Sequence, residues 1–265
     1  MSRGTRVFGV IGWPVAHSLS PVIHRAAFRS LGVDAVSGAL PVRPEDLAAA
    51  VAGIRALGIG GVSVTAPHKE AVVAHLDTLD AGAEEVGAVN TIARDGDALV
   101  GHNTDRAGLR RFLQDAGVAV EGASGLILGA GGAARACALA LRDLGIGRLT
   151  IAAREPAAAR MPVEAEAIAF EDAAAVAADV VVNATPLGWH GERVPVVPRR
   201  GQRVIDLVYR QTPLLEAARA AGAEAHDGLG MLAGQAASAV EIWAGSAPDI
   251  SAMTDAAVDA RARLV

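Results

Sequence analysis

The chain has 265 residues, of which 52% are hydrophobic and 20% charged, so it can form one large or two modest globular domains with well-filled interiors. The net charge of −5 gives no general attraction to nucleic acid or anionic lipid, and we expect neither as a partner. The single cysteine, Cys137, excludes an intrachain disulfide and argues against a cysteine-based zinc site, so we expect no bound metal.

Strand-like and helix-like segments alternate along the first hundred residues, which is typical of an α/β fold. Two glycines interrupt the apolar stretch 7–13, which therefore predicts a buried strand and not a signal peptide. No apolar run approaches the roughly 18 residues of a membrane-spanning helix, so we expect a cytoplasmic protein. In chain order, we predict strands at 6–12, 36–42 and 60–66, helices at 21–31, 44–57 and 69–79, and a hairpin of 89–94 with 98–102.

Local signals refine two of these elements. Ser20 is a candidate N-cap, with Pro21 as the first helical residue. With Asp95-Gly96 as the turn of the hairpin, counting back places Asn90 opposite Gly101. Asn90 and Asp105 then lie near the same end of the hairpin, although Asp105 could equally serve as the cap of the helix that follows.

A second series of strands and helices begins near residue 125 and has the βαβ rhythm of a dinucleotide-binding domain. We therefore predict a substrate domain of residues 1–104 with about 235–265, whose C-terminal helices return to it, and a Rossmann-like domain of residues 105–234. The predicted strands lie at 125–129, 148–152, 179–184 and 203–209. The predicted helices are a linking helix at 105–117, one from the glycine turn to about 144, and two at 213–221 and 231–244; the alanine-rich stretch 156–178 is predicted as a helix and connection.

The run G-A-G-G-A-A at 129–134 lies between a predicted strand and a predicted helix. Gly129 and Gly131 occupy the first two glycine positions of a dinucleotide fingerprint, and Ala134 fits the third. The helix N-terminus would offer N–H groups and positive dipole to a pyrophosphate. After the next strand, Arg154 suits a 2′-phosphate whereas Glu155 suits a 2′-hydroxyl, so the choice between NADP and NAD stays open.

Lys69 is the only lysine in a chain with 24 lysine and arginine residues. An arginine keeps its charge at any pH a protein meets, whereas a lysine can exchange a proton when its surroundings permit. Lys69 is therefore a candidate acid/base. Two further candidates are Ser18 and Ser20, whose hydroxyls beside a helix N-terminus could seat a carboxylate, although Ser20 could simply cap the helix.

Several motifs, in this order along the chain, resemble those of the shikimate dehydrogenase family. They are G-W-P-V-A-H-S-L-S-P (12–21), V-S-V-T-A-P-H-K (62–69), G-A-V-N-T-I (87–92), N-T-D (103–105), G-A-G-G-A-A-R (129–135), N-A-T-P-L-G (183–188), Tyr209 with T-P-L-L (212–215), and D-G-L-G-M-L-A-G-Q-A (227–236).

The resemblance implies reduction of 3-dehydroshikimate to shikimate with NADPH, a step of aromatic amino-acid biosynthesis. It implies that Lys69 and Asp105 are the catalytic pair and that two serines hold the substrate carboxylate. The substrate-binding residues it implies are Ser18, Ser20, Thr65, Asn90, Asp105, Tyr209 and Gln235. The cofactor-binding residues it implies are Gly129, Ala130, Gly131, Gly132, Ala133, Arg154, Thr185, Leu207, Gly228 and Met231.

The sequence departs from the family pattern in the segment expected to bind NADP. The family's Asn-Arg-Thr is replaced by residues 153–155, Ala-Arg-Glu, and a further arginine is replaced by Ala158. Alternative interpretations are therefore an NAD-linked quinate/shikimate dehydrogenase, a dehydrogenase of another small hydroxy acid such as an aminoshikimate, and a non-catalytic dinucleotide-binding sensor. We expect a monomer or a homodimer.

Overall fold

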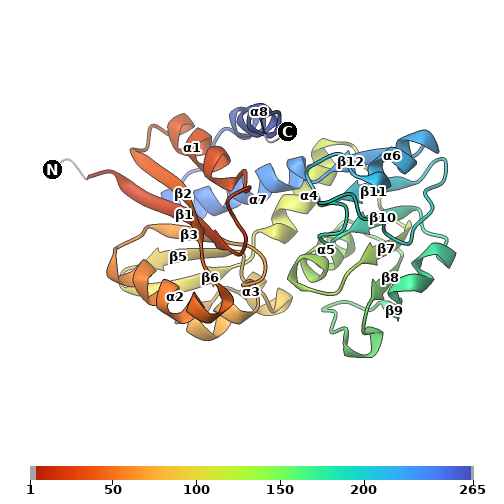
Figure 1. Cartoon of the computed structure of the whole chain (residues 1–265), viewed down its shortest axis with the longest axis horizontal. Helices are drawn as coiled ribbons and strands as arrows, with labels where there is room; N and C mark the ends of the chain where they lie inside the picture. Colours follow the sequence, from red (N-terminus) through yellow and green to blue (C-terminus); the bar gives the residue numbers. More distant parts are fainter. Residues whose placement is uncertain (1–3, 264–265) are drawn as a thin grey trace. The chain divides into compact units, whose positions relative to one another are not determined.

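The computed structural model of the protein describes residues 4–263, and the chain divides into two compact units (Figure 1). Unit 1 comprises Met1–Gly108 with Leu232–Val265, and unit 2 comprises Leu109–Met231. The boundaries fall within two helices, α4 (Asp105–Asp115) and α7 (Leu229–Ala244). None of the helices within residues 4–263 combines the length and apolar character needed to span a bilayer.

Unit 1 is built on a six-stranded sheet in the order β2-β1-β3-β5-β6-β4. Strands β2, β1 and β3 run parallel, whereas β5 is antiparallel to both β3 and β6. The carboxyl ends of β1, β2 and β3 therefore meet at one edge of the sheet, where ligands of α/β folds commonly bind. The strands are β1 (Arg6–Gly12), β2 (Ala35–Pro41), β3 (Gly61–Val64), β4 (Thr78–Leu79), β5 (Thr91–Asp95) and β6 (Ala98–His102).

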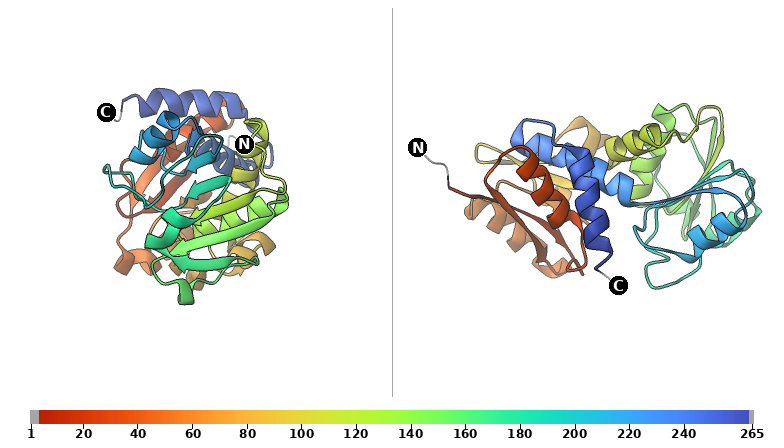
Figure 2. Two further views of the ribbon diagram at one scale, coloured as in Figure 1. Left: turned by 90° about the vertical axis from the view of Figure 1, so that its right-hand side faces the viewer. Right: turned by 90° about the horizontal axis from the view of Figure 1, so that it is seen from above.

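Helices from both ends of the chain cover this sheet. The C-terminal helix α8 lies against α1, as the dark blue and red ribbons of Figure 2 show. From α7, the Trp243 ring stacks on Phe8 at 5.2 Å between centroids, and its Nε1 donates to the Ile92 carbonyl at 3.0 Å. The predicted return of the C-terminal helices to the first domain is thus confirmed. Besides α7, the helices are α1 (Ser20–Ser30), α2 (Leu47–Ala56), α3 (Ala81–Val86) and α8 (Ile250–Arg261).

Unit 2 contains a parallel six-stranded sheet with the order β12-β11-β10-β7-β8-β9, seen face-on in the left view of Figure 2. Read from β9, the strands have the 3-2-1-4-5-6 order of a dinucleotide-binding fold. The chain adds strands on one side of β7 and then on the other, so the switch point of the strand order lies between β7 and β10. The predicted Rossmann-like domain is confirmed. Its elements are β7 (Ser124–Leu128), α5 (Gly132–Asp143), β8 (Arg148–Ala153), β9 (Glu166–Ala169), β10 (Val180–Asn183), β11 (Arg203–Asp206), α6 (Pro213–Ala220) and β12 (Glu224–Asp227).

Both faces of this sheet are buried, as expected for parallel strands. Successive residues of β7 alternate between two apolar clusters. Ile127 packs in a cluster with Cys137 of α5, whereas Leu126 packs in another with Leu214 of α6. This double burial explains why the central strands read as almost continuous apolar runs.

Two predicted helices are wrong because tertiary pairing overrides local composition. Instead of a helix at 69–79, a 3₁₀ turn at Ala71–His75 leads into β4. Asp77 exchanges hydrogen bonds with the backbone of Leu99, which draws the chain onto the edge of β6. In the alanine-rich stretch 156–178, β9 pairs with β8. Pro162, which has no N–H to donate, disfavours a continuous helix there.

Two local predictions also need correction. Ser20 does not cap α1: the N-cap is Leu19, with no capping side chain, and Ser20 is the first helical residue. In the hairpin, Asp95 pairs with Ala98, so the turn is Gly96-Asp97 and Gly101 faces Ile92. Glycine at the first turn position, with φ of +58°, favours this register over the predicted one.

Candidate functional site

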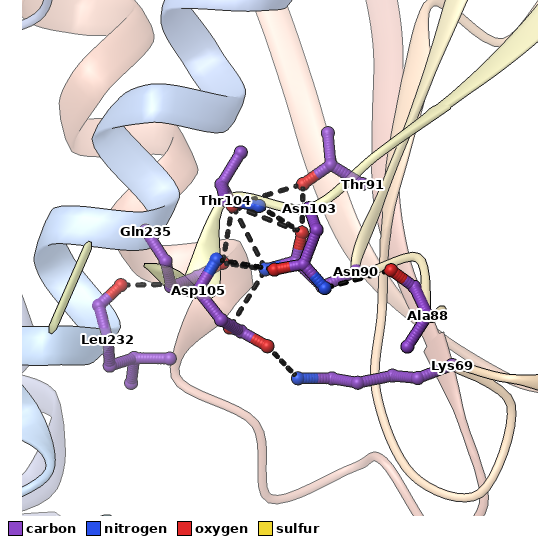
Figure 3. A network of polar contacts seen from close by, with 9 residues as sticks. All are labelled: Lys69, Ala88, Asn90, Thr91, Asn103, Thr104, Asp105, Leu232 and Gln235. Atoms are coloured by element: carbon purple, nitrogen blue, oxygen red, sulfur yellow. Dashed lines mark hydrogen bonds and ion pairs between the residues drawn. The ribbon is translucent and has the colours of Figure 1, made fainter. Parts of the chain in front are cut away.

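The side chains of Lys69 and Asp105 meet in unit 1 (Figure 3). Lys69 Nζ donates to Asp105 Oδ2 at 2.5 Å, and the two side chains are 22% and 6% exposed. Lys69 lies in the loop after β3, and Asp105 is the first residue of α4. The pair therefore joins the carboxyl edge of the parallel strands to the start of α4. The Lys69 amine is more accessible to solvent than the Asp105 carboxylate.

Asn90 holds the carboxylate of this pair from the other side. Its Nδ2 donates to Asp105 Oδ1 at 2.8 Å and also lies 2.9 Å from Thr104 Oγ1. Its Oδ1 accepts the backbone N–H of Thr104 at 2.8 Å. Asn90 and Asp105 do lie at the same end of the hairpin, because Asn90 N donates to the His102 carbonyl directly beyond the last paired residues. The expected proximity is confirmed despite the shifted register.

Gln235 joins this network from α7, about 130 residues further along the chain than Asp105. Its Oε1 lies 3.3 Å from Asn90 Nδ2, and its Nε2 donates to the Leu232 carbonyl at 3.0 Å. The helices approach closely here, because a Cβ on Gly108 would fall 2.6 Å from the Gln235 nitrogen. Glycine at this position lets α7 bring the Gln235 amide to Asn90.

Of the two predicted serines, Ser18 lies in the loop between β1 and α1, and Ser20 is the first residue of α1. Ser18 is half-buried and its Oγ accepts the Ser20 N–H at 3.2 Å, whereas Ser20 is 5% exposed. This loop adjoins the one that carries Lys69: a Cβ on Gly12 would lie 2.5 Å from Thr65 Cγ2, and Trp13 N donates to the Ala66 carbonyl. The structure thus sets both loops side by side at the same sheet edge.

In unit 2, the glycine turn links β7 to α5 as predicted. Gly129 has φ of +106°, and a Cβ there would lie 3.3 Å from Thr185 Cγ2 and 3.4 Å from the Ala184 carbonyl. Gly131 is the N-cap of α5, so Gly132 and Ala133 begin the helix. The backbone is therefore open beside a helix N-terminus, which is the geometry that accepts a pyrophosphate. Ala130 lies between the two glycines, and its carbonyl accepts from Arg135 at 3.3 Å.

The loop after β10 is fixed to the neighbouring strand. Asn183 Nδ2 donates to Asp206 Oδ1 at 2.9 Å, and its Oδ1 accepts Thr185 Oγ1 at 2.6 Å. Gly228 packs against Leu207 so closely that any side chain would strike the Leu207 carbonyl. Met231 is buried in the apolar cluster beneath the sheet. Of the four predicted cofactor residues, Thr185 follows β10, which borders the switch point, Leu207 follows β11, and Gly228 and Met231 follow β12.

Comparison with known proteins identifies the family. The models described as the shikimate dehydrogenase substrate binding domain and the shikimate 5′-dehydrogenase C-terminal domain match residues 10–92 and 228–258. A shikimate dehydrogenase (NADP(+)) of Methanothermobacter thermautotrophicus is 44% identical and covers 95% of each chain. The chain belongs to the shikimate dehydrogenase family.

Solved structures of the family agree with this assignment. The shikimate 5-dehydrogenase of Thermus thermophilus, in complex with NADP(H) and shikimate, is 38% identical with a TM-score of 0.87 and covers 97% of this chain and 100% of that chain. The Listeria monocytogenes enzyme, in complex with shikimate and NAD, is 33% identical with a TM-score of 0.82, covering 96% and 97%. Relatives on this frame thus include complexes with either dinucleotide.

Against this family, the departures lie after β8. Arg154 and Glu155 are both exposed, and Glu155 precedes the short 3₁₀ turn Pro156–Ala158. The exposed Arg160 folds back onto this turn, donating to the Ala157 carbonyl at 2.9 Å. In the segment 153–158, the positive charge available to a 2′-phosphate is thus that of Arg154, which has the negative charge of Glu155 beside it.

Sequence reasoning did not single out Thr104 and Thr91, which complete the network around Asn90. Thr104 is 4% exposed and Thr91 fully buried, and their hydroxyls lie 3.3 Å apart. Asn103 Oδ1 accepts the Asp105 N–H at 3.1 Å, directly before α4. The run N-T-D before a helix was the available signal, but it fits a cap equally well. Among residues 4–263, no cluster of three His, Cys, Asp or Glu side chains could hold a metal.

Proposed function

We propose that this chain is an NADP-linked shikimate dehydrogenase that reduces 3-dehydroshikimate to shikimate. The observation that carries the proposal is the Lys69–Asp105 contact at 2.5 Å within a buried amide and hydroxyl network. Membership of the family and the NADP-dependent relatives support it. A non-catalytic sensor would have no need to retain this acid/base pair.

In the proposed mechanism, Lys69 gives a proton to the ketone oxygen as it becomes an alcohol, and takes it back in the reverse reaction. Asp105 fixes the ammonium at 2.5 Å, and Asn90 fixes the carboxylate in turn, so the donor is oriented before substrate arrives. The fractional exposure of Lys69, 22% against 6% for Asp105, leaves the amine able to reach a ligand.

The remaining residues bind and orient the substrate in this proposal. Ser18 and Ser20 hold the carboxylate beside the N-terminus of α1, where the helix dipole favours negative charge. Thr65 and Gln235, with the Asn90–Asp105 pair, bind ring hydroxyls. Because such a site leaves its polar groups unpaired when a hydroxyl is missing, it rejects analogues that lack one.

The glycine turn of unit 2 fits a dinucleotide, since a Cβ at Gly129 would fill the space between the turn and Thr185. NADPH, when bound, would supply the hydride that the ring carbon accepts. The backbone of residues 129–133 would hold the pyrophosphate, and Arg154 the 2′-phosphate. Thr185, Leu207, Gly228 and Met231 complete the proposed cofactor residues, with Tyr209 on the substrate. We propose that residues 1–104, together with about 235–265, bind the substrate and that residues 105–234 bind the cofactor. The residues named above support this division.

The experiment is to measure oxidation of shikimate and of quinate with NADP and with NAD, in four pairings. We expect the highest kcat/KM with shikimate and NADP. A preference for quinate with NAD would replace the proposal by the quinate/shikimate alternative, and turnover in none of the pairings would refute it. Light scattering tests the expected monomer or homodimer, and cell fractionation tests the expected cytoplasmic location.

A further inference from the structure

Tyr209 is the only tyrosine of the chain and lies at the tip of a loop of unit 2 that follows β11. The base of this loop is closed by Asp206, whose Oδ2 accepts Thr212 Oγ1 at 2.7 Å and whose Oδ1 accepts Val208 N at 3.1 Å. Asp206 is fully buried, and this burial raises the pKa of its carboxyl. The loop therefore has a rigid base, and the orientation of Tyr209 depends on what holds its tip.

A second loop, which follows β10, lies against the first. Gly188 has φ of +103°, and a Cβ there would lie 2.9 Å from Thr212 Cγ2, so the Gly188 backbone packs on the Thr212 side chain without room for a side chain of its own. Glu192 Oε2 accepts the N–H groups of Gly188 at 3.0 Å and His190 at 2.9 Å. These bonds hold the pKa of the Glu192 carboxyl below its usual range. The segment that presents Trp189 is thus braced on both sides of that residue.

Trp189 and Arg210 join the tips of the two loops. The Trp189 and Tyr209 rings meet edge to face, with centroids 5.1 Å apart and an interplanar angle of 81°. The Arg210 guanidinium lies 4.7 Å from the centroid of the Trp189 ring, and its Nη1 donates to the Trp189 carbonyl at 3.3 Å. The residue that follows Tyr209 in the chain therefore reaches back to the ring that Tyr209 contacts.

We propose that Trp189 and Arg210 are positioning residues that fix the Tyr209 side chain for substrate. The inference rests on the proposed function for the role of Tyr209, but the positioning itself depends only on contacts within unit 2. An edge-to-face aromatic pair and a cation over an indole ring each restrict the partner's orientation as well as burying area. Trp189 therefore acts through Tyr209.

The first test observes Tyr209 directly. Because the chain has one tyrosine, ring-¹³C-labelled tyrosine gives a single residue's signals by NMR. We expect these signals to move toward those of an unstructured tyrosine in Trp189→Ala, and to move less in Trp189→Phe, which keeps an aromatic ring. Arg210→Gln should shift them, whereas Arg193→Gln, which removes an exposed arginine of the same segment, should not. Signals unchanged in Trp189→Ala and Arg210→Gln would overturn the proposal.

The second test measures coupling in the reaction. In the wild-type background we expect Trp189→Ala to raise the KM for shikimate about two- to tenfold, the range that one aromatic contact supports, with a smaller change in kcat. In a Tyr209→Ala background the same substitution should change KM by less than about twofold, since its partner is gone. An effect of equal size in both backgrounds would show that Trp189 acts without Tyr209. If the wild type does not turn over shikimate, the proposed function fails, and the NMR result still decides the positioning role.

Discussion

Lys69 is the residue on which the proposed chemistry depends. In the described structure its ammonium contacts Asp105 at 2.5 Å, and the chain uses arginine at every other basic position. An arginine in its place would keep the ion pair but would not exchange a proton at neutral pH. The identity of this residue, and not only its charge, therefore distinguishes acid/base catalysis from simple electrostatic binding.

We expect both Lys69→Ala and Lys69→Arg to lower kcat by about 10² to 10⁴, the usual contribution of a positioned acid/base. Steady-state kinetics with shikimate and NADP measures the effect. Arg55→Gln, which breaks a surface ion pair with Asp77, serves as the control and should leave kcat unchanged. Near-normal turnover in Lys69→Arg would mean that only the positive charge matters.

Two exposed residues, Arg154 and Glu155, should set the preference between the dinucleotides. Arg154→Gln removes the cation available to a 2′-phosphate, so we expect kcat/KM with NADP to fall at least about tenfold, the value of one charged hydrogen bond, with little change for NAD. Glu155→Gln removes a repulsive charge and should raise the ratio of kcat/KM for NADP over NAD. Unchanged ratios in both variants would place phosphate recognition elsewhere.

The proximity of Asn90 and Asp105 could be predicted from the sequence, because a hairpin and a helix start fix local geometry. Thr104 was not singled out, since a threonine before a helix fits a cap as well as a buried network. Ser20 was wrong as a cap because Leu19 is already in the αR conformation, which sequence does not reveal.

At the scale of elements, the close approach of α4 and α7 within unit 1 sets the position of Gln235. A Cβ on Gly108 would lie 2.6 Å from the Gln235 nitrogen and 2.8 Å from its Cβ. Gly234 lies at the same contact, with a Cβ position 3.0 Å from the Gly108 carbonyl. These contacts are to backbone or to the stem of a side chain, so the helices would have to separate to admit a methyl group.

We therefore expect Gly108→Ala to displace Gln235, to raise the KM for shikimate and to lower the free energy of unfolding by about 1 to 3 kcal/mol. Gly53→Ala is the matched control, because it lies inside α2 with open space around its Cβ position and should stabilise by about 0.5 to 1 kcal/mol. Kinetics and denaturant unfolding measure both variants. If the two glycines responded alike, the packing of α4 on α7 would not control the site.

Elements with strong local signals were predicted well, whereas the short edge strands β4, β9 and β12 were not. β7 and α5 carry a strand, a glycine turn and a helix in immediate succession, so their identity is local. β12, of four residues, was missed because it exists only by pairing with β11, to which residues 213–220 return the chain. Pairings of this kind depend on contacts that no local pattern encodes.

At the scale of the whole molecule, His24 ties together much of unit 1. Its Nδ1 lies 3.0 Å from Ser37 Oγ of β2, its Nε2 lies 3.3 Å from Ser63 Oγ of β3, and its ring meets Trp243 of α7 at 5.1 Å between centroids. Burial, reinforced by the charge of Arg25, lowers the pKa of the His24 imidazole from 6.5 to about 3. The folded chain therefore requires this histidine to stay neutral.

This buried histidine should make folding stability depend on pH. Between pH 6.5 and about 3 the unfolded chain binds a proton at His24 that the folded chain does not, so stability falls as the pH is lowered through this window. The expected slope is up to about 1.4 kcal/mol per pH unit. Denaturant unfolding from pH 7 to 4.5 measures it in a range that stays above the ordinary pKa of aspartate, 3.8, and ends at that of glutamate, 4.5.

The comparison that isolates His24 is its replacement by a side chain that does not titrate. His24→Gln should be less stable than wild type at pH 7, because its hydrogen bonds to two serines are altered, but its stability should fall less steeply toward pH 4.5. His190→Gln, at an exposed position, should keep the wild-type slope. If His24→Gln also kept that slope, other groups would carry the acid sensitivity of the fold, and the neutral histidine would not limit its stability.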